Sequence, residues 1–214
     1  MFNETEIAQQ VAEFLLQIKA IKLQPTNPFT WASGWKSPIY CDNRVTLSHP
    51  TIRTYIRQQL TKVIQEVFGS AGCIAGVATA GIPQGVLVAQ DLGLPFIYVR
   101  SKPKEHGTGS QIEGDSSLTG QRVVVIEDLI STGKSSLQAV EALRNAGYDV
   151  AGLAAIFTYG FDEAVENFKQ ANCPFVTLSN YNALISYAGQ NQYITEADAE
   201  LLKTWRENPS VWGR

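Results

Sequence analysis

Two adjacent carboxylates, Glu127 and Asp128, follow an apolar run and directly precede a turn of small polar residues. The run, 123–126, consists of four β-branched residues, which is typical of a strand buried on both faces of a parallel sheet. We expect the strand to end at the two acids. The turn leads into an apolar-periodic helix, and the amides at a helix N-terminus bind anions. Acids beside an anion site fit a ligand that carries hydroxyls next to a phosphate, as a ribose 5-phosphate does.

Two other interpretations of this stretch are considered. Gly133-Lys134-Ser135 matches the end of a P-loop, but the first glycine of that motif would fall at Asp128. A side chain there blocks the close backbone approach that a polyphosphate needs, so the pattern disfavours a nucleotide triphosphatase. The other alternative is an ordinary strand-to-helix turn whose acids are only solvated.

A second group of charged residues follows a predicted strand at 96–100. Arg100, Lys102, Lys104 and His106 occur at every second position, so an extended segment would place all four on one face. A solvated sheet edge is the usual explanation of such a run. Here three glycines follow within eight residues, which predicts a flexible loop over 101–118. A cationic loop of this kind suits a lid that closes over a diphosphate, and His106 could assist a departing group.

The segment from Phe29 to Arg44 is aromatic and irregular, with a strand pair predicted around its Ser-Gly turn. A flat heteroaromatic ligand needs apolar faces and a cation, which Tyr40, Lys36 and Arg44 could supply. Two tryptophans of this segment are expected to serve in packing rather than in ligand contact.

Overall composition limits the function classes. The 214-residue chain has a net charge of −3 and a pI near 5.4, which argues against binding to nucleic acid or to a membrane surface. No apolar run is long enough for a membrane span or a signal peptide. Three widely spaced cysteines without a CxxC pattern predict reduced thiols in a cytoplasmic protein.

Strands and helices alternate from residue 73 to 178, which predicts an α/β fold with an open parallel sheet flanked by helices. A turn of small residues, Thr79 to Pro83, follows one of these strands and is a second candidate anion loop. The expected organisation comprises three parts. They are N-terminal helices and a hood segment at 1–70, a core at 71–180 that includes the loop 101–118, and C-terminal helices at 181–214 that complete the hood.

Three segments together carry a family resemblance: Phe29 to Arg44, Arg100 to Gly107 and Glu127 to Ser135. The last resembles the phosphoribosyl diphosphate (PRPP) motif of type I phosphoribosyltransferases. The Arg-x-Lys-x-Lys-x-His-Gly loop and the Phe-Thr-x-x-Ser-Gly-x-x-Ser-Pro-Ile-Tyr segment resemble the orotate phosphoribosyltransferases in particular. That resemblance implies transfer of a 5-phosphoribosyl group from PRPP to orotate. The products would be orotidine 5′-monophosphate and diphosphate, in de novo pyrimidine (UMP) biosynthesis.

The resemblance also implies residue roles. Lys104, His106 and Arg100 would be catalytic and bind the diphosphate, and Ser131, Arg44, Lys36 and Tyr40 would contact orotate. The PRPP contacts from the acid pair and the turn would be Glu127, Asp128, Leu129, Ile130, Ser131, Thr132, Gly133, Lys134 and Ser135. Mg²⁺ would be held through PRPP and water without direct protein ligands. The enzyme would be a homodimer in which the loop 101–118 completes the neighbouring site.

Several positions depart from the enteric members of that family. Ser101, Ala80 and Ala32 stand where a basic residue is common, and no arginine follows the strand that ends near Tyr159. We expect Arg44 or Lys36 to replace the missing cations for the orotate carboxylate. Two alternatives stay open: transfer to another nucleobase, and a non-catalytic PRPP-binding regulator.

Overall fold

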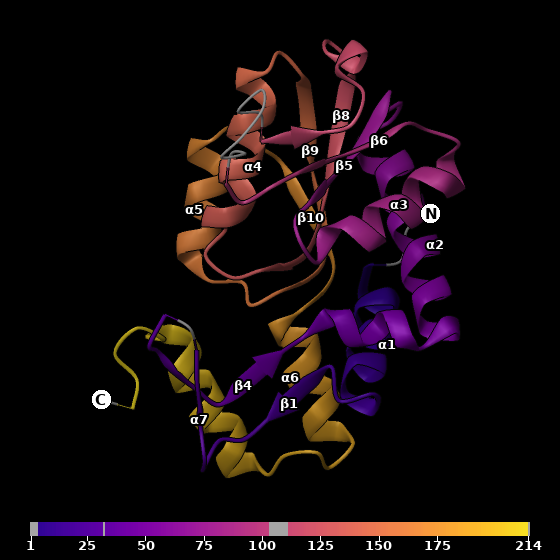
Figure 1. Cartoon of the computed structure of the whole chain (residues 1–214). Coiled ribbons are helices and arrows are strands. Elements are labelled where there is room, and N and C mark those ends of the chain that lie inside the picture. The colour runs from indigo at the N-terminus through magenta and orange to yellow at the C-terminus, as the bar shows by residue number, and fades with distance from the viewer. Residues whose placement is uncertain (1–3, 32, 103–110, 214) are drawn as a thin grey trace.

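The computed structural model describes residues 4–31, 33–102 and 111–213, which form two lobes (Figure 1). The larger lobe is built on a six-stranded sheet of order β10-β9-β8-β5-β6-β7. Neighbouring strands are parallel except for β7, which is antiparallel to β6. The strands are β5 (Cys73–Val77), β6 (Phe96–Val99), β7 (Ile112–Glu113), β8 (Arg122–Ile130), β9 (Asp149–Thr158) and β10 (Phe175–Asn180). The predicted open α/β sheet is confirmed.

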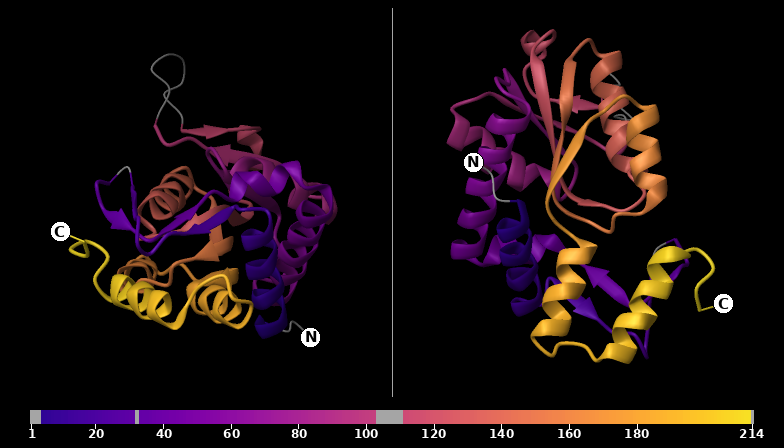
Figure 2. Two further views of the ribbon diagram at one scale, coloured as in Figure 1. Left: turned by 90° about the horizontal axis from the view of Figure 1, so that it is seen from below. Right: turned by 180° about the vertical axis from the view of Figure 1, so that it is seen from behind.

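Helices cover both faces of this sheet (Figures 1 and 2). One face packs against α1 (Glu4–Gln17), α2 (Pro50–Val67) and α3 (Gly81–Leu92), and the other against α4 (Lys134–Asn145) and α5 (Asp162–Gln170). Within the described ranges, no helix has the length and apolarity that a membrane crossing requires.

The strand β8 lies at the centre of the sheet and is buried on both faces, as its run of β-branched residues predicts. Val124 and Ile126 belong to the core beneath α1–α3, whereas Val123 and Val125 belong to the core beneath α4 and α5. The expectation that the strand ends at the acids is wrong. It continues to Ile130 because its last residues pair with the end of β9.

The smaller lobe lies below the sheet in Figure 1, and we call it the hood. It comprises two small antiparallel pairs, β1 with β4 and β2 with β3, together with two C-terminal helices. The bounds are β1 (Ile21–Leu23), β2 (Phe29–Thr30), β3 (Lys36–Ser37), β4 (Ile39–Cys41), α6 (Tyr181–Gln190) and α7 (Glu196–Glu207). The predicted strand pair around the Ser-Gly turn is β2–β3, and a capping box formed by Thr195 and Asp198 begins α7.

The structure adds two details to the expected organisation. The second half of the predicted loop 101–118 contains β7 and a short 3₁₀ helix, Ser116–Leu118. The helix α2, which lies within the predicted segment 1–70, packs on the sheet against α3 and β9. Local periodicity does not reveal either feature, because both depend on partners distant in sequence.

Candidate active site

The acid pair lies at the carboxyl edge of the central strand. Glu127 is 6% exposed, and its two carboxylate oxygens accept hydrogen bonds from the Ser136 hydroxyl (3.2 Å) and the Asp128 amide (3.0 Å). Ser136 is buried in the first turn of α4. The helix after the strand therefore fixes the orientation of the first acid.

Both acids are electrostatically perturbed. Burial raises the pKa of Glu127 well above its ordinary value, and the charge of Asp128 raises it further. Burial also raises the pKa of Asp128, and the nearby Asp42 adds to this, while Arg44 opposes it. The buried Glu127 and the half-buried Asp128 resist holding two negative charges side by side, so hydrogen bonds donated by ligand hydroxyls would stabilise their ionised forms.

Asn43 fixes the backbone of the second acid, a contact that the sequence analysis missed. Its side-chain amide donates to the Asp128 carbonyl at 2.7 Å, and the residue is 1% exposed. Asn43 begins a 3₁₀ helix, Asn43–Ser48, directly after the hood strands. The two residues are 85 positions apart in sequence, and only the position of Asn43 within the predicted base-binding segment hinted at this role.

The turn after the acids leads into α4 without a side-chain cap. Gly133 occupies the N-cap position, so no side chain satisfies the first amides of the helix. The Thr132 carbonyl accepts a hydrogen bond from the Asn167 side chain of α5 at 2.9 Å, which anchors the turn. Ser131 and Thr132 are half-buried, and Ser135 is exposed. The arrangement suits an anion at the end of α4.

Gly133 is needed for this turn. Its φ is +80°, and a Cβ placed on it would lie 2.7 Å from the ring of Phe168. Gly133→Ala is expected to lower the free energy of unfolding by about 1–3 kcal/mol, measured by urea denaturation, and to weaken phosphate binding. The control is Gly189→Ala in α6, where a Cβ meets nothing within 4 Å and alanine favours the helix. Equal stability of the two variants would contradict the prediction.

Lys134, one of the predicted PRPP contacts, points to α5. Its ammonium forms an ion pair with Glu163 at 3.0 Å, and both side chains are largely exposed. Such a pair contributes little to stability. Lys134 can therefore turn toward an anion at small cost.

The second candidate anion loop lies beside the first. The loop follows β5, which neighbours β8, and α3 begins at Gly81 without a side-chain cap. A Cβ on Gly81 would clash with the Ile126 carbonyl, and one on Gly76 would lie 2.9 Å from the Gly81 carbonyl. Glycine at these two positions allows the loop to pack directly on the strands. Two uncapped helix N-termini thus lie at the same sheet edge.

The predicted base-binding residues lie on the hood strands and just after them. Lys36 donates to the Thr30 hydroxyl at 2.7 Å, and among the described residues no acid pairs with it. Arg44 donates to both oxygens of Asp42, at 2.7 and 2.9 Å, and these bonds lower the pKa of Asp42. The Tyr40 side chain is 38% exposed.

The basic segment is described only in part. Arg100 follows β6, and its guanidinium lies 3.4 Å from the Glu113 carboxylate on β7. Lys102 is exposed. Lys104 and His106 lie outside the described residues, so their proposed roles stay predictions.

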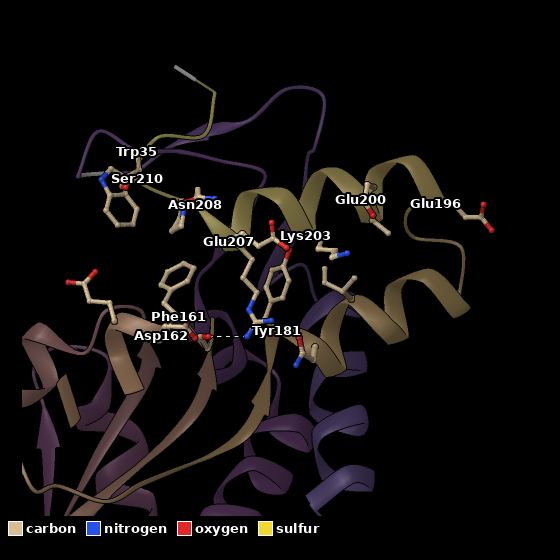
Figure 3. A pocket seen from close by; sticks show the side chains of 17 residues that line it. Trp35, Phe161, Asp162, Tyr181, Glu196, Glu200, Lys203, Glu207, Asn208 and Ser210 are labelled. Atoms are coloured by element: carbon tan, nitrogen blue, oxygen red, sulfur yellow. Dashed lines mark hydrogen bonds between the residues drawn. The ribbon is translucent and has the colours of Figure 1, made fainter. Parts of the chain in front are cut away.

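A cleft of about 860 Å³ separates the hood helices from the end of the sheet (Figure 3). The apolar part of the cleft wall comes from Trp35, Phe161, Tyr181 and Ile185. Glu163, which forms the ion pair with Lys134, also lines the cleft. Trp31 packs beside it against Tyr159, with ring centroids 5.1 Å apart, so the expectation that this tryptophan serves in packing is confirmed.

The chain is similar to known proteins over nearly its whole length. The phosphoribosyl transferase domain family matches residues 47–189. The orotate phosphoribosyltransferase of Phocaeicola vulgatus is 57% identical over 201 residues, 94% of each chain. That of Listeria innocua is 56% identical over 97% of this chain and 99% of its own. This chain belongs to the orotate phosphoribosyltransferase family.

Solved structures agree with this family at the level of the fold. The orotate phosphoribosyltransferase of Aeropyrum pernix superposes with a TM-score of 0.74 at 29% identity, covering 86% of this chain and 99% of that one. The UMP synthase of Leishmania donovani gives a TM-score of 0.78 at 26% identity, covering 93% of this chain and 42% of that one. The family resemblance inferred from the three sequence segments is therefore confirmed.

Proposed function

We propose that the protein transfers the 5-phosphoribosyl group of PRPP to N1 of orotate, giving orotidine 5′-monophosphate and diphosphate for pyrimidine (UMP) biosynthesis. The observation that carries this proposal is the pair of the buried Glu127 and the half-buried Asp128 next to the uncapped N-terminus of α4. Membership of the orotate phosphoribosyltransferase family supports orotate as the acceptor.

Each part of the site has a role in this reaction. Glu127 and Asp128 accept hydrogen bonds from the ribose 2- and 3-hydroxyls, and the amides and hydroxyls of residues 131–135 hold the 5-phosphate. The C1 carbon becomes oxocarbenium-like as diphosphate leaves, so the reaction needs stabilisation of the leaving group and an in-line nucleophile. The leaving diphosphate is stabilised by Arg100, Lys104 and His106. The nucleophile, N1 of orotate, is positioned by Ser131 and the hood.

The donor chemistry of the site fits Mg²⁺. Glu127 and Asp128 offer hard carboxylate oxygens at the edge where the diphosphate and ribose oxygens of PRPP would lie. Within the described ranges, no cluster of three acidic, histidine or cysteine residues could hold a metal. As the family resemblance implies, Mg²⁺ would be held by PRPP oxygens and water, and it would neutralise charge on the leaving group.

The assembly and location belong to the same proposal. We infer a cytoplasmic homodimer in which the loop 101–118 of one subunit reaches the site of the other. Family resemblance supports the dimer, and the described partner of Arg100 is on β7 rather than at the acid pair. Three free cysteines fit a reducing compartment.

The deciding experiment is a base-specificity assay. Purified protein with PRPP and Mg²⁺ is expected to consume orotate, and adenine, hypoxanthine and uracil are expected to be consumed at least about 100-fold more slowly because the latter lack the carboxylate. Preference for another base would identify a different phosphoribosyltransferase. PRPP binding without turnover of any base would identify a regulator.

Lys36 is expected to contribute more than Arg44 to orotate binding. Asp42 already neutralises Arg44, whereas the Lys36 ammonium has no acid partner among the described residues. Lys36→Met should raise the KM for orotate about tenfold, and Arg44→Met less than about threefold. Initial rates at saturating PRPP measure both. A larger rise in the KM for orotate in Arg44→Met than in Lys36→Met would assign the orotate carboxylate to Arg44. An unchanged KM in both variants would exclude both residues from binding it.

A further inference from the structure

Two neighbouring residues of α7 connect the hood to the sheet. Trp205 is fully buried, and its indole N–H donates to the Lys36 carbonyl of β3 at 3.2 Å. Its ring contacts Trp31 in the hood and Phe161 beyond β9, with centroids 5.6 and 5.5 Å away. Trp205 thus fixes the β2–β3 hairpin to α7.

Arg206 extends in the other direction, to the end of the sheet. Its guanidinium donates to the Tyr159 carbonyl at 3.3 Å, to the Gly160 carbonyl at 3.0 Å and to the Asn182 side chain at 3.0 Å. It also lies 5.5 Å from the centre of the Tyr181 ring. One side chain therefore binds the two carbonyls that directly follow β9 and the first turn of α6.

The cleft beside Arg206 increases the importance of this bridge. About 860 Å³ of open space lies between α7 and the residues that begin α5 and α6, so side chains do not fill this part of the boundary between the lobes. Lys36 lies on the β2–β3 hairpin of the hood, whereas Glu127 and Asp128 lie on β8 in the larger lobe. The spacing between these two groups therefore depends on the contacts that α7 makes with both lobes.

We propose that Arg206 is a positioning residue that holds the base-binding hairpin of the hood at reacting distance from the sugar-phosphate edge of the sheet. It touches neither substrate and acts through α7, Trp205 and Lys36. This inference rests on the proposed function, because it assigns the base to the hood and PRPP to the sheet. Loss of the bridge should therefore affect the two substrates unequally.

The test compares Arg206→Ala with Arg206→Lys and with a matched control. Arg144 of α4 also donates to two carbonyls, those of Ala171 at 2.6 Å and Asn172 at 2.9 Å, but it joins α4 only to the end of α5. Arg206→Ala is expected to raise the KM for orotate about tenfold and to lower kcat, with the KM for PRPP changed less than about twofold, because small misplacements cost large factors in rate. Arg206→Lys, which retains one donor group, should recover part of the orotate effect.

The control and the melting temperatures separate positioning from stability. Arg144→Ala should lower the melting temperature to a similar extent and leave both KM values within about twofold. If Arg206→Ala does not fold, Arg206→Lys is measured in its place. Its KM for orotate is then expected to rise about threefold, with the KM for PRPP unchanged. Equal changes in both KM values, or a loss of active protein without any change in KM, would overturn the proposal. A wild-type protein that consumes no orotate would overturn the proposed function, and this inference with it.

Discussion

Glu127→Gln is expected to slow phosphoribosyl transfer about 100-fold and at the same time to stabilise the free protein at neutral pH. The rate falls because an amide replaces a carboxylate oxygen that would accept a ribose hydroxyl. The stability rises because an amide avoids the cost of either ionising or protonating a carboxyl group buried beside Asp128, while the Ser136 hydroxyl keeps a partner.

The stability effect has a defined pH dependence. The pKa of Glu127 is raised in the folded protein, so the folded state binds more protons than the unfolded state between the two pKa values. The free energy of unfolding of the wild type therefore falls as pH rises through that window. The melting temperature of the variant should exceed that of the wild type by several degrees above pH 7, and this difference should disappear near pH 4.

Glu141→Gln is the control for this prediction. Glu141 is an exposed acid of α4, so its replacement should change neither turnover nor the pH dependence of melting. A difference between Glu127→Gln and wild type that is the same at every pH would contradict the assignment of a buried, perturbed carboxylate pair.

Lys104→Ala is expected to lower kcat by about 10²–10³-fold while largely preserving PRPP binding, because the lysine would act on charge that develops as diphosphate leaves. Initial rates give kcat, and direct titration gives PRPP affinity. Lys169→Ala, which removes an exposed lysine of α5, is the control and should leave kcat unchanged. Unchanged turnover in Lys104→Ala would exclude the lid assignment.

Mixing two inactive variants tests whether the loop acts between subunits. Lys104→Ala lacks the loop residue, and Glu127→Gln lacks the acid, so a mixed dimer contains one complete site if the loop crosses to the partner. Random exchange should then restore about a quarter of the wild-type activity. If the loop serves its own subunit, every site stays defective and mixing restores nothing.

Local signals in the sequence predicted most of the core. The β-branched run of β8, the proline that starts α2 and the Thr195/Asp198 box that starts α7 each encode their element within a few residues. Ligands of open α/β sheets bind beyond the carboxyl ends of the strands, so acids that follow such a run are expected at the site. These features could be predicted because their causes are short-range or follow from the fold class.

The features that were missed depend on distant partners. The strand β8 passes through both acids because Leu129 pairs with Phe157, and β1 pairs with β4 across an irregular segment. Asn43 reaches Asp128 across 85 positions, which no local pattern reveals. By contrast, the Asp42–Arg44 pair is a short-range contact that the sequence could have suggested.

The positions of the tryptophans give the hood its own optical signal. All four belong to the hood: Trp31 and Trp35 lie between β2 and β3, Trp205 lies in α7, and Trp212 follows α7, so the six-stranded sheet contains none. Trp31 and Trp205 contact each other at the base of the hood. Intrinsic fluorescence excited at the tryptophan band therefore reports on the hood alone, so its unfolding or rearrangement can be followed without a label while circular dichroism follows the whole molecule.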